Sequence, residues 1–186
     1  MKKILLYLLL FVSISSMISC NNMGVNPEKI FSKIGLNGNK IPRSFKSHFN
    51  EIRVHIANGT LTIVTPKNEV KKGVTATEYM LNHYPNMFDE DIKSIKELAT
   101  DEESKPIVDA GLEMFLYADE IYKKDFPRIA KMIDEGKPDE EIDAAIESLD
   151  NTKGLELDKK YNKAMDLLLP YADKNGVEYK VQETRF

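Results

Sequence analysis

Cysteine is almost absent from this chain of 186 residues, since Cys20 is its only one. No intramolecular disulfide can form, so a folded part must depend on its hydrophobic core alone for stability. Histidine is also scarce, with His48, His55 and His83 as the three in the chain. None of them stands beside another histidine or a cysteine at the spacing of a zinc site, and we therefore expect no metal-binding residues.

Catalytic signatures are missing as well. The chain has no Gly-x-Ser-x-Gly motif, no phosphate-binding glycine loop and no dinucleotide fingerprint. Its acidic clusters, 89–91, 101–103 and 139–141, fall at expected helix starts, where carboxylates favour the helix dipole and face water. Such carboxyls should lack the raised pKa that acid catalysis needs. We therefore expect no catalytic residues, no cofactor-binding residues and no cofactor.

A basic surface is a further absence. Lysine and arginine number 26 against 30 acidic residues, so the formal net charge is −4. It becomes more negative if Lys2 and Lys3 are removed with the N-terminal segment discussed next. An acidic chain without a basic block is not expected to bind nucleic acid.

Long apolar runs are limited to one, Ile4 to Val12, which follows Lys2 and Lys3 and precedes three serines. A membrane-spanning helix needs roughly 20 apolar residues, and this run is much shorter. A short cationic start, an apolar stretch and a small residue before the cut are typical of a secretory signal peptide. The pattern predicts a signal peptide over residues 1–19.

The end of this segment, Met17-Ile18-Ser19-Cys20, resembles the bacterial lipobox, with Met17 in place of the usual leucine. The resemblance implies that Cys20 receives a diacylglycerol and becomes the first mature residue. The chain would then be a bacterial lipoprotein of the cell envelope, anchored through lipid on Cys20 at the periplasmic or outer surface face of a membrane. Residues 20–26 would be the lipidated cysteine and a short tether, and residues 27–186 a single mainly helical domain.

Helix signals dominate that domain. Asn26 is a candidate N-cap with Pro27 at the first helical position. Thr75 and Glu78 have the spacing of a capping box, and Pro85 should break or kink the helix that follows. Apolar side chains then recur at helical spacing as far as Lys174.

Signals for helix starts and helix ends divide the chain from Ser104 to Gly176 into separate helices. Ser104 is a candidate cap of a long helix, Pro127 is expected to start a separate short one, and Pro138 to open the next. The last helix is expected from about Leu155 to Lys174, with Asn175-Gly176 ending it. The stripes expected to face inward are Ile107, Gly111, Met114, Ala118 and Ile121; Ile142, Ala145, Ile146 and Leu149; and Leu157, Tyr161, Ala164, Met165, Leu168 and Tyr171.

The segment from residue 45 to 65 fits two structures. Phe45, Phe49, Ile52 and Ile56 recur at helical spacing. Val54, Ile56, Leu61 and Ile63, however, fall on one face of a hairpin turning at Asn58-Gly59, a strong type I′ signal. We favour the hairpin over residues 51–65, because it explains both halves of the segment.

Val177, Tyr179 and Val181 also alternate, and they predict a possible short C-terminal strand. The expected fold class is therefore mainly α: a helical bundle with a small β-hairpin near the N-terminus.

The expected function follows from the anchor and from the missing catalytic motifs. It is a non-catalytic binding or structural module, with a possible envelope protein as partner. The alternative is an immunity-type inhibitor of an envelope-degrading enzyme. Six tyrosines in the expected helices could line a groove for a ligand, but core-edge positions with the hydroxyl in water are the favoured interpretation. They are Tyr79, Tyr84, Tyr117, Tyr122, Tyr161 and Tyr171.

Overall fold

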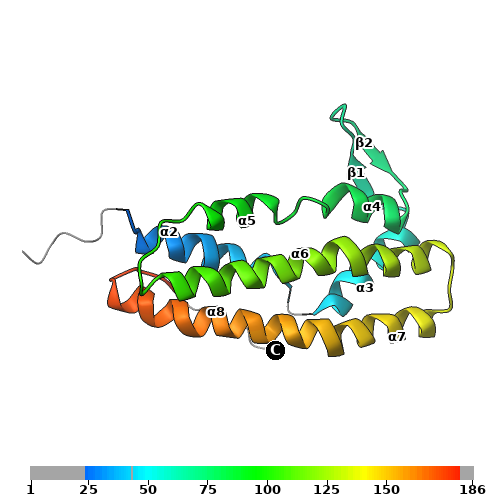
Figure 1. Cartoon of the computed structure of the whole chain (residues 1–186). Coiled ribbons are helices and arrows are strands. Elements are labelled where there is room, and N and C mark those ends of the chain that lie inside the picture. The colour runs from blue at the N-terminus through cyan, green and yellow to red at the C-terminus, as the bar shows by residue number, and fades with distance from the viewer. Residues whose placement is uncertain (1–23, 43, 181–186) are drawn as a thin grey trace, which may run out of the picture.

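A computed structural model describes residues 24–42 and 44–180 as a bundle of helices with one small hairpin (Figure 1). This confirms the expected mainly α fold class. The helices are α2 (Pro27–Phe31), α3 (Phe45–Ala57), α4 (Ala76–His83), α5 (Asp89–Lys96), α6 (Lys105–Asp134), α7 (Asp139–Leu149) and α8 (Leu155–Lys174); the π-helices η1 (Ser32–Leu36) and η2 (Asp150–Gly154) follow α2 and α7, and the strands are β1 (Thr62–Val64) and β2 (Val70–Lys72).

The longest helix, α6, runs the length of the bundle and contacts α4, α5, α7 and α8 (Figure 1). Its 30 residues correspond to about 45 Å at 1.5 Å per residue. The stripe expected from the sequence, Ile107 to Ile121, is buried as predicted. Gly111 lies in that stripe because a Cβ there would come within 2.8 Å of the fully buried Ile34 side chain.

The separate helix expected to start at Pro127 does not exist, because α6 continues through this residue. Proline in a helix interior removes one backbone hydrogen bond. Here Phe126, Ile129 and Ala130 are completely buried around it, and packing of that apolar face outweighs the lost bond.

Several of the expected helix ends are confirmed. The side chain of Asn26 accepts a hydrogen bond from the amide of Lys29, and Thr75 and Glu78 form the complete capping box. The chain leaves the helix after His83, just before Pro85, and resumes it at Asp89. The inward stripes of α7 and α8 are buried or partly buried as expected.

The starts of α3 and α4 also bind carboxylates from distant parts of the chain. Asp150 in η2 accepts hydrogen bonds from the backbone amides of Phe45 and Lys46 at the start of α3. Asp134, the last residue of α6, does the same for Ala76 and Thr77 at the start of α4. These contacts join the C-terminal half of the domain to α3 and α4.

The hairpin favoured for residues 51–65 is wrong, because α3 is a continuous helix as far as Ala57. Phe45, Phe49 and Ile52 are buried on one face of this helix. Asn58 has a φ of −86°, whereas a type I′ turn needs positive φ at both central residues. Gly59 does have a positive φ, +63°, because it follows the C-terminus of α3 in the left-handed conformation common there.

The hairpin lies further along the chain, where β1 and β2 form a two-stranded antiparallel sheet. Ile63, expected in the second strand of the hairpin, instead belongs to the first, and Leu61 comes just before that strand. Pro66, Lys67 and Asn68 form the turn, with a hydrogen bond from the Asn68 amide to the Thr65 carbonyl and a φ of +64° at Asn68. A type I turn followed by a left-handed residue is a common three-residue hairpin connection.

The possible C-terminal strand is not formed by residues 177–180, and Val181 lies outside the described residues. Instead, Val177 and Tyr179 pack on the core, where the Tyr179 ring lies 4.9 Å from that of Phe31. Among the described residues, no helix is both long enough and apolar enough to cross a membrane.

Candidate functional site

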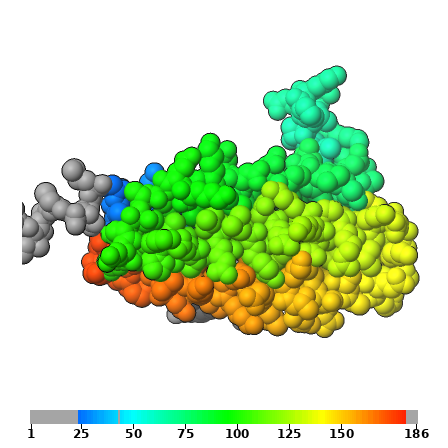
Figure 2. Space-filling view, in the orientation of Figure 1, coloured from blue at the N-terminus to red at the C-terminus, as the bar shows by residue number. Residues whose placement is uncertain are grey.

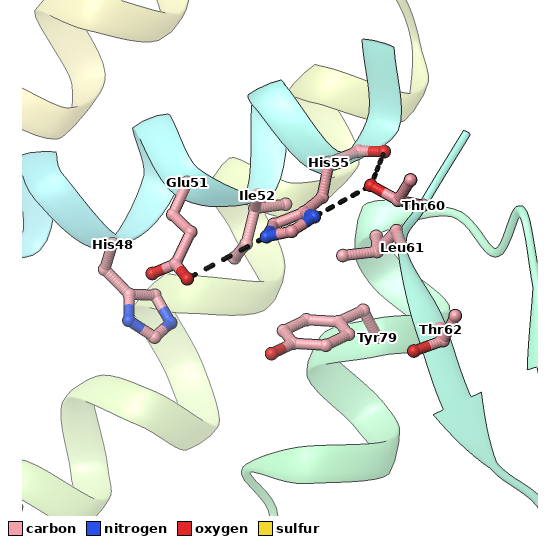
Figure 3. Close-up of a pocket in the computed structure, with 8 residues that line it drawn as sticks. All are labelled: His48, Glu51, Ile52, His55, Thr60, Leu61, Thr62 and Tyr79. Atoms are coloured by element: carbon pink, nitrogen blue, oxygen red, sulfur yellow. Dashed lines mark hydrogen bonds and ion pairs between the residues drawn. The ribbon is translucent and has the colours of Figure 1, made fainter. Parts of the chain in front are cut away.

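A small cleft opens where α3, β1 and α4 meet, at the end of the bundle that carries the hairpin (Figures 1 and 3). Its volume is about 130 Å³. We call it the α3–α4 cleft. It is lined by His48, Glu51, Ile52, His55, Thr60, Leu61, Thr62 and Tyr79.

The helical period of α3 places His48, Glu51 and His55 on one side of the cleft. Thr60 to Thr62 form a second side as the chain enters β1, and Tyr79 of α4 forms the third (Figure 3). In the hairpin expected from the sequence, His55 would lie on the strand face opposite to Val54 and Ile56. The helix instead gives it the same face as His48, which a strand could not.

His48 connects the cleft to the aromatic core. Its Nε2 lies 2.5 Å from the hydroxyl of Tyr84. Burial lowers the pKa of His48, against a smaller opposing effect of Glu51. Burial also raises the pKa of Tyr84, helped by the neighbouring Tyr79. The phenol therefore stays protonated beside the imidazole, and the tautomer of His48 decides which of the two groups donates.

His83 lies beside the cleft, so all three histidines of the chain are in this region. Its ring stacks on Tyr79, with centroids 4.2 Å apart, and Tyr79 packs edge-on against Tyr84. Within the described residues, no group of three histidine, cysteine or acidic side chains is arranged to hold a metal ion.

Glu51, His55 and Thr60 form the one arrangement in the cleft that resembles a catalytic triad (Figure 3). The Thr60 hydroxyl lies 2.8 Å from His55 Nδ1, and His55 Nε2 lies 3.9 Å from the Glu51 carboxylate. The second distance is too long for the hydrogen bond that orients a catalytic histidine.

The surroundings of Thr60 also suit a structural role better than a catalytic one. Its hydroxyl is a donor to the main-chain oxygen of His55 at 3.4 Å. The amides of Thr60 and Leu61, which are next to the hydroxyl, both donate to that same oxygen. They are thus occupied and do not form an oxyanion hole. The contacts of Thr60 close the C-terminus of α3.

The acidic clusters behave differently from one another. Asp91 was expected to face water but is buried, bound by Lys40 at 2.8 Å and by Asn37 at 2.7 Å. Asp139 pairs with Arg53 of α3. Asp101 caps the turn before α6, and its hydrogen bonds to Ser104 lower the pKa of its carboxyl. These three acids stabilise the fold.

The tyrosines lie deeper than expected. Tyr84, Tyr122 and Tyr171 are buried, while Tyr79, Tyr117 and Tyr161 are partly buried. The ring of Tyr122 packs on those of Phe126 and Tyr84, with centroid distances of 4.1 Å and 5.2 Å. Of these six tyrosines, Tyr79 alone lines the α3–α4 cleft. The six therefore do not line a common groove there.

The hairpin beside the cleft projects from the bundle (Figures 1 and 2). Val64 and Val70 are cross-strand partners, and their side chains are 52% and 65% exposed. The opposite face carries Leu61 and Ile63, which pack on the core. The hairpin therefore exposes a pair of apolar side chains to solvent, where they add nothing to the hydrophobic core.

Cys20, the expected lipidation site, lies outside the described residues. No protein-family model matches the chain, and searches of curated proteins and of solved structures found no match either. The fold class is thus a helical bundle with a projecting hairpin, and the site is a histidine-containing cleft at the base of that hairpin.

Proposed function

We propose that the protein is a lipid-anchored binding module of the cell envelope, held on a membrane through Cys20 and contacting an envelope protein through its opposite end. The observation that carries the proposal is the distance between these two ends. Gly24, the first described residue, lies next to Ala99 at the end of the bundle where α2 and α5 meet α6. The hairpin, and the elements α3 and α4 whose residues line the cleft, lie towards the other end (Figure 1).

The length of α6, about 45 Å, sets how far the hairpin end stands from the tether. A tether of about seven residues would keep the near end close to the lipid. The far end would then reach into the surrounding compartment. At that distance, the far end would be accessible to a partner protein in the compartment.

The surface of the far end supports contact with a protein. Val54 of α3, Leu81 of α4 and the hairpin valines are all more than half exposed. These residues belong to elements that pack on one another around the cleft. They are four of the eight large apolar side chains that are exposed in the described residues, and exposed apolar patches are typical of protein contact sites. We propose a non-catalytic role, because His55 and Thr60, two members of the arrangement that resembles a triad, hold the end of α3.

Two measurements in the bacterial host test the proposal. Labelled fatty acid should be incorporated into the wild-type chain and not into Cys20→Ser, which should be released or misprocessed. A photo-crosslinking residue at Val54 or Leu81 should trap an envelope protein, and one at Leu167 of α8 should not. A wild-type chain that takes up no label would show that the anchor is wrong.

The same crosslinks separate the two roles expected from the sequence. Wall or envelope-complex components would support the structural or binding role. Crosslinking to a single, tightly bound envelope-degrading enzyme would instead support the role of an immunity-type inhibitor. The activity of that enzyme should then fall on binding.

A further inference from the structure

The outer edge of β2 is an unpaired strand edge. The amide of Gly73 bonds to the Leu61 carbonyl, and the amide of Thr65 bonds to the Glu69 carbonyl. Residues alternate along an antiparallel ladder between bonded and non-bonded pairs. The pairs Thr62–Lys72 and Val64–Val70 are therefore the non-bonded ones. Their main-chain groups point away from the partner strand.

The two outward edges differ in what covers them. On the β1 side, the Val64 carbonyl accepts a hydrogen bond from the Asn82 side chain, and α4 packs against the strand. On the β2 side, every residue is exposed, and the sheet has no third strand within the described residues. Val70 and Lys72 thus present two amides and two carbonyls to solvent.

Side chains along this edge restrict what could pair with it. Lys67, Lys71 and Lys72 lie on the hairpin against the single acid Glu69, in a chain with net charge −4. Lys71 is paired with Glu78, whereas no ion pair is formed by Lys72 in the described part of the chain. Lysine on an edge strand opposes pairing with an identical strand, because like charges would meet. A second copy of this hairpin is therefore disfavoured, and a strand with carboxylates is favoured.

We propose that the outer edge of β2 binds an extended, acidic segment of the partner protein, which adds to the hairpin as a third strand. Main-chain groups of Val70 and Lys72 hold the segment, as in other cases of strand addition. An apolar side chain of the segment packs beside Val70 and the exposed Val64, and a glutamate or aspartate lies beside Lys72. The inference rests on the proposed function, since it describes how the far end makes its contact.

The test uses the full chain, isotopically labelled in a mild detergent, and a capped peptide Thr-Val-Glu-Glu-Glu-Val-Thr. A counterpart with lysines in place of the glutamates is the control peptide. The acidic peptide should shift the amide signals of Val70 and Lys72 and slow their hydrogen exchange, and the lysine peptide should do neither. Equal binding of both peptides, or shifts confined to other elements, would overturn the inference.

Two variants check the geometry. Val70→Pro removes an outward amide that makes no bond in the hairpin, a position where an edge strand tolerates proline. It should abolish peptide binding. Lys72→Glu leaves every main-chain group in place, and it should weaken binding of the acidic peptide at least tenfold and permit binding of the lysine peptide. Lys93→Glu, the same change on the exposed surface of α5, should alter neither.

Failure here is distinguishable from failure of the proposed function. The peptide experiment needs no lipid on Cys20 and no host partner. If the peptides do not bind while crosslinks from Val54 and Leu81 persist, the binding module stands and strand addition is wrong. Unaltered binding to Val70→Pro and Lys72→Glu would also reject the β2 edge.

Discussion

Asp150 and Phe45 lie 105 residues apart in the sequence, yet the Asp150 carboxylate accepts a 2.8 Å hydrogen bond from the Phe45 amide. Ser44 stands at the N-cap of α3 but does not cap it with its own side chain. The carboxylate therefore fills the role of the local cap, and its charge also favours the positive end of the helix dipole.

Asp150→Ala should lower the free energy of unfolding by about 1–2 kcal/mol, the usual cost of losing an N-cap. The amides of Phe45 and Lys46 should exchange faster with solvent. Urea unfolding and hydrogen exchange measure the two effects. Asp166→Ala on the exposed surface of α8 is the matched control and should change neither; an unchanged Asp150→Ala would deny the cap any energetic role.

Gly59 terminates α3 at a φ of +63°, and nothing lies within 4 Å of a Cβ added there. The cost of a side chain is thus purely conformational. Gly59→Val should destabilise the protein by about 1–2 kcal/mol, the penalty of the left-handed conformation for an ordinary residue. Gly59→Asn should cost less, because asparagine tolerates that conformation. Equal unfolding midpoints for the two variants would contradict this explanation.

His48 should make stability fall below pH 6.5. Its folded pKa is lowered by burial from 6.5, so the unfolded chain binds the proton first as the pH decreases. The stability that neutral His48 contributes is fully present above 6.5 and is lost as the pH falls through the folded pKa. One such proton gives a slope of at most about 1.4 kcal/mol per pH unit.

Urea unfolding of the wild type and of His48→Gln at several pH values between about 7.5 and 5 isolates this effect, since other groups contribute equally to both. The difference in stability between the two proteins should shrink as the pH decreases. A difference that stays constant across this range would show that His48 titrates alike in the folded and unfolded chain.

Thr60 should prove structural. Thr60→Ala removes its hydrogen bonds to His55 and should cost about 1 kcal/mol. Hydrolysis of p-nitrophenyl acetate should be the same for the wild type and the variant, at the background of free imidazole. Turnover above that background, lost in Thr60→Ala and in Glu51→Gln, would reveal a working triad.

The sequence signals that succeeded were those whose cause is local. The capping box at Thr75 and Glu78 and the break before Pro85 are decided within one helical turn, and the structure has both. Pro127 and the segment 45–57 are decided by packing instead. The buried faces around Phe126 and Phe49 outweighed a missing amide in one case and an Asn-Gly signal in the other.

The candidate site was not visible in the sequence for a related reason. The sequence alone does not show that His48, His55 and His83 lie close together. His48 and His55 share a face only because α3 is a helix, and His83 is near them only because α4 packs against α3. Gly59 has the positive φ that the expected type I′ turn requires. The end of a helix requires the same conformation, and in this structure Gly59 ends α3. Pro66 and Asn68 carried the true turn signal, a proline followed by a residue that tolerates the left-handed conformation.

The carboxylates that start α3 and α4 come from residues 150 and 134, far downstream of both helices. A ribosome delivers these carboxylates only after most of the chain has been made, so α3 and α4 gain these hydrogen bonds late, although α4 also has its local capping box at Thr75 and Glu78. In a chain exported as proposed, these hydrogen bonds would form last, when residues 134 and 150 reach the far side of the membrane. Until then each of the two helix starts would lack a contact worth about 1 kcal/mol.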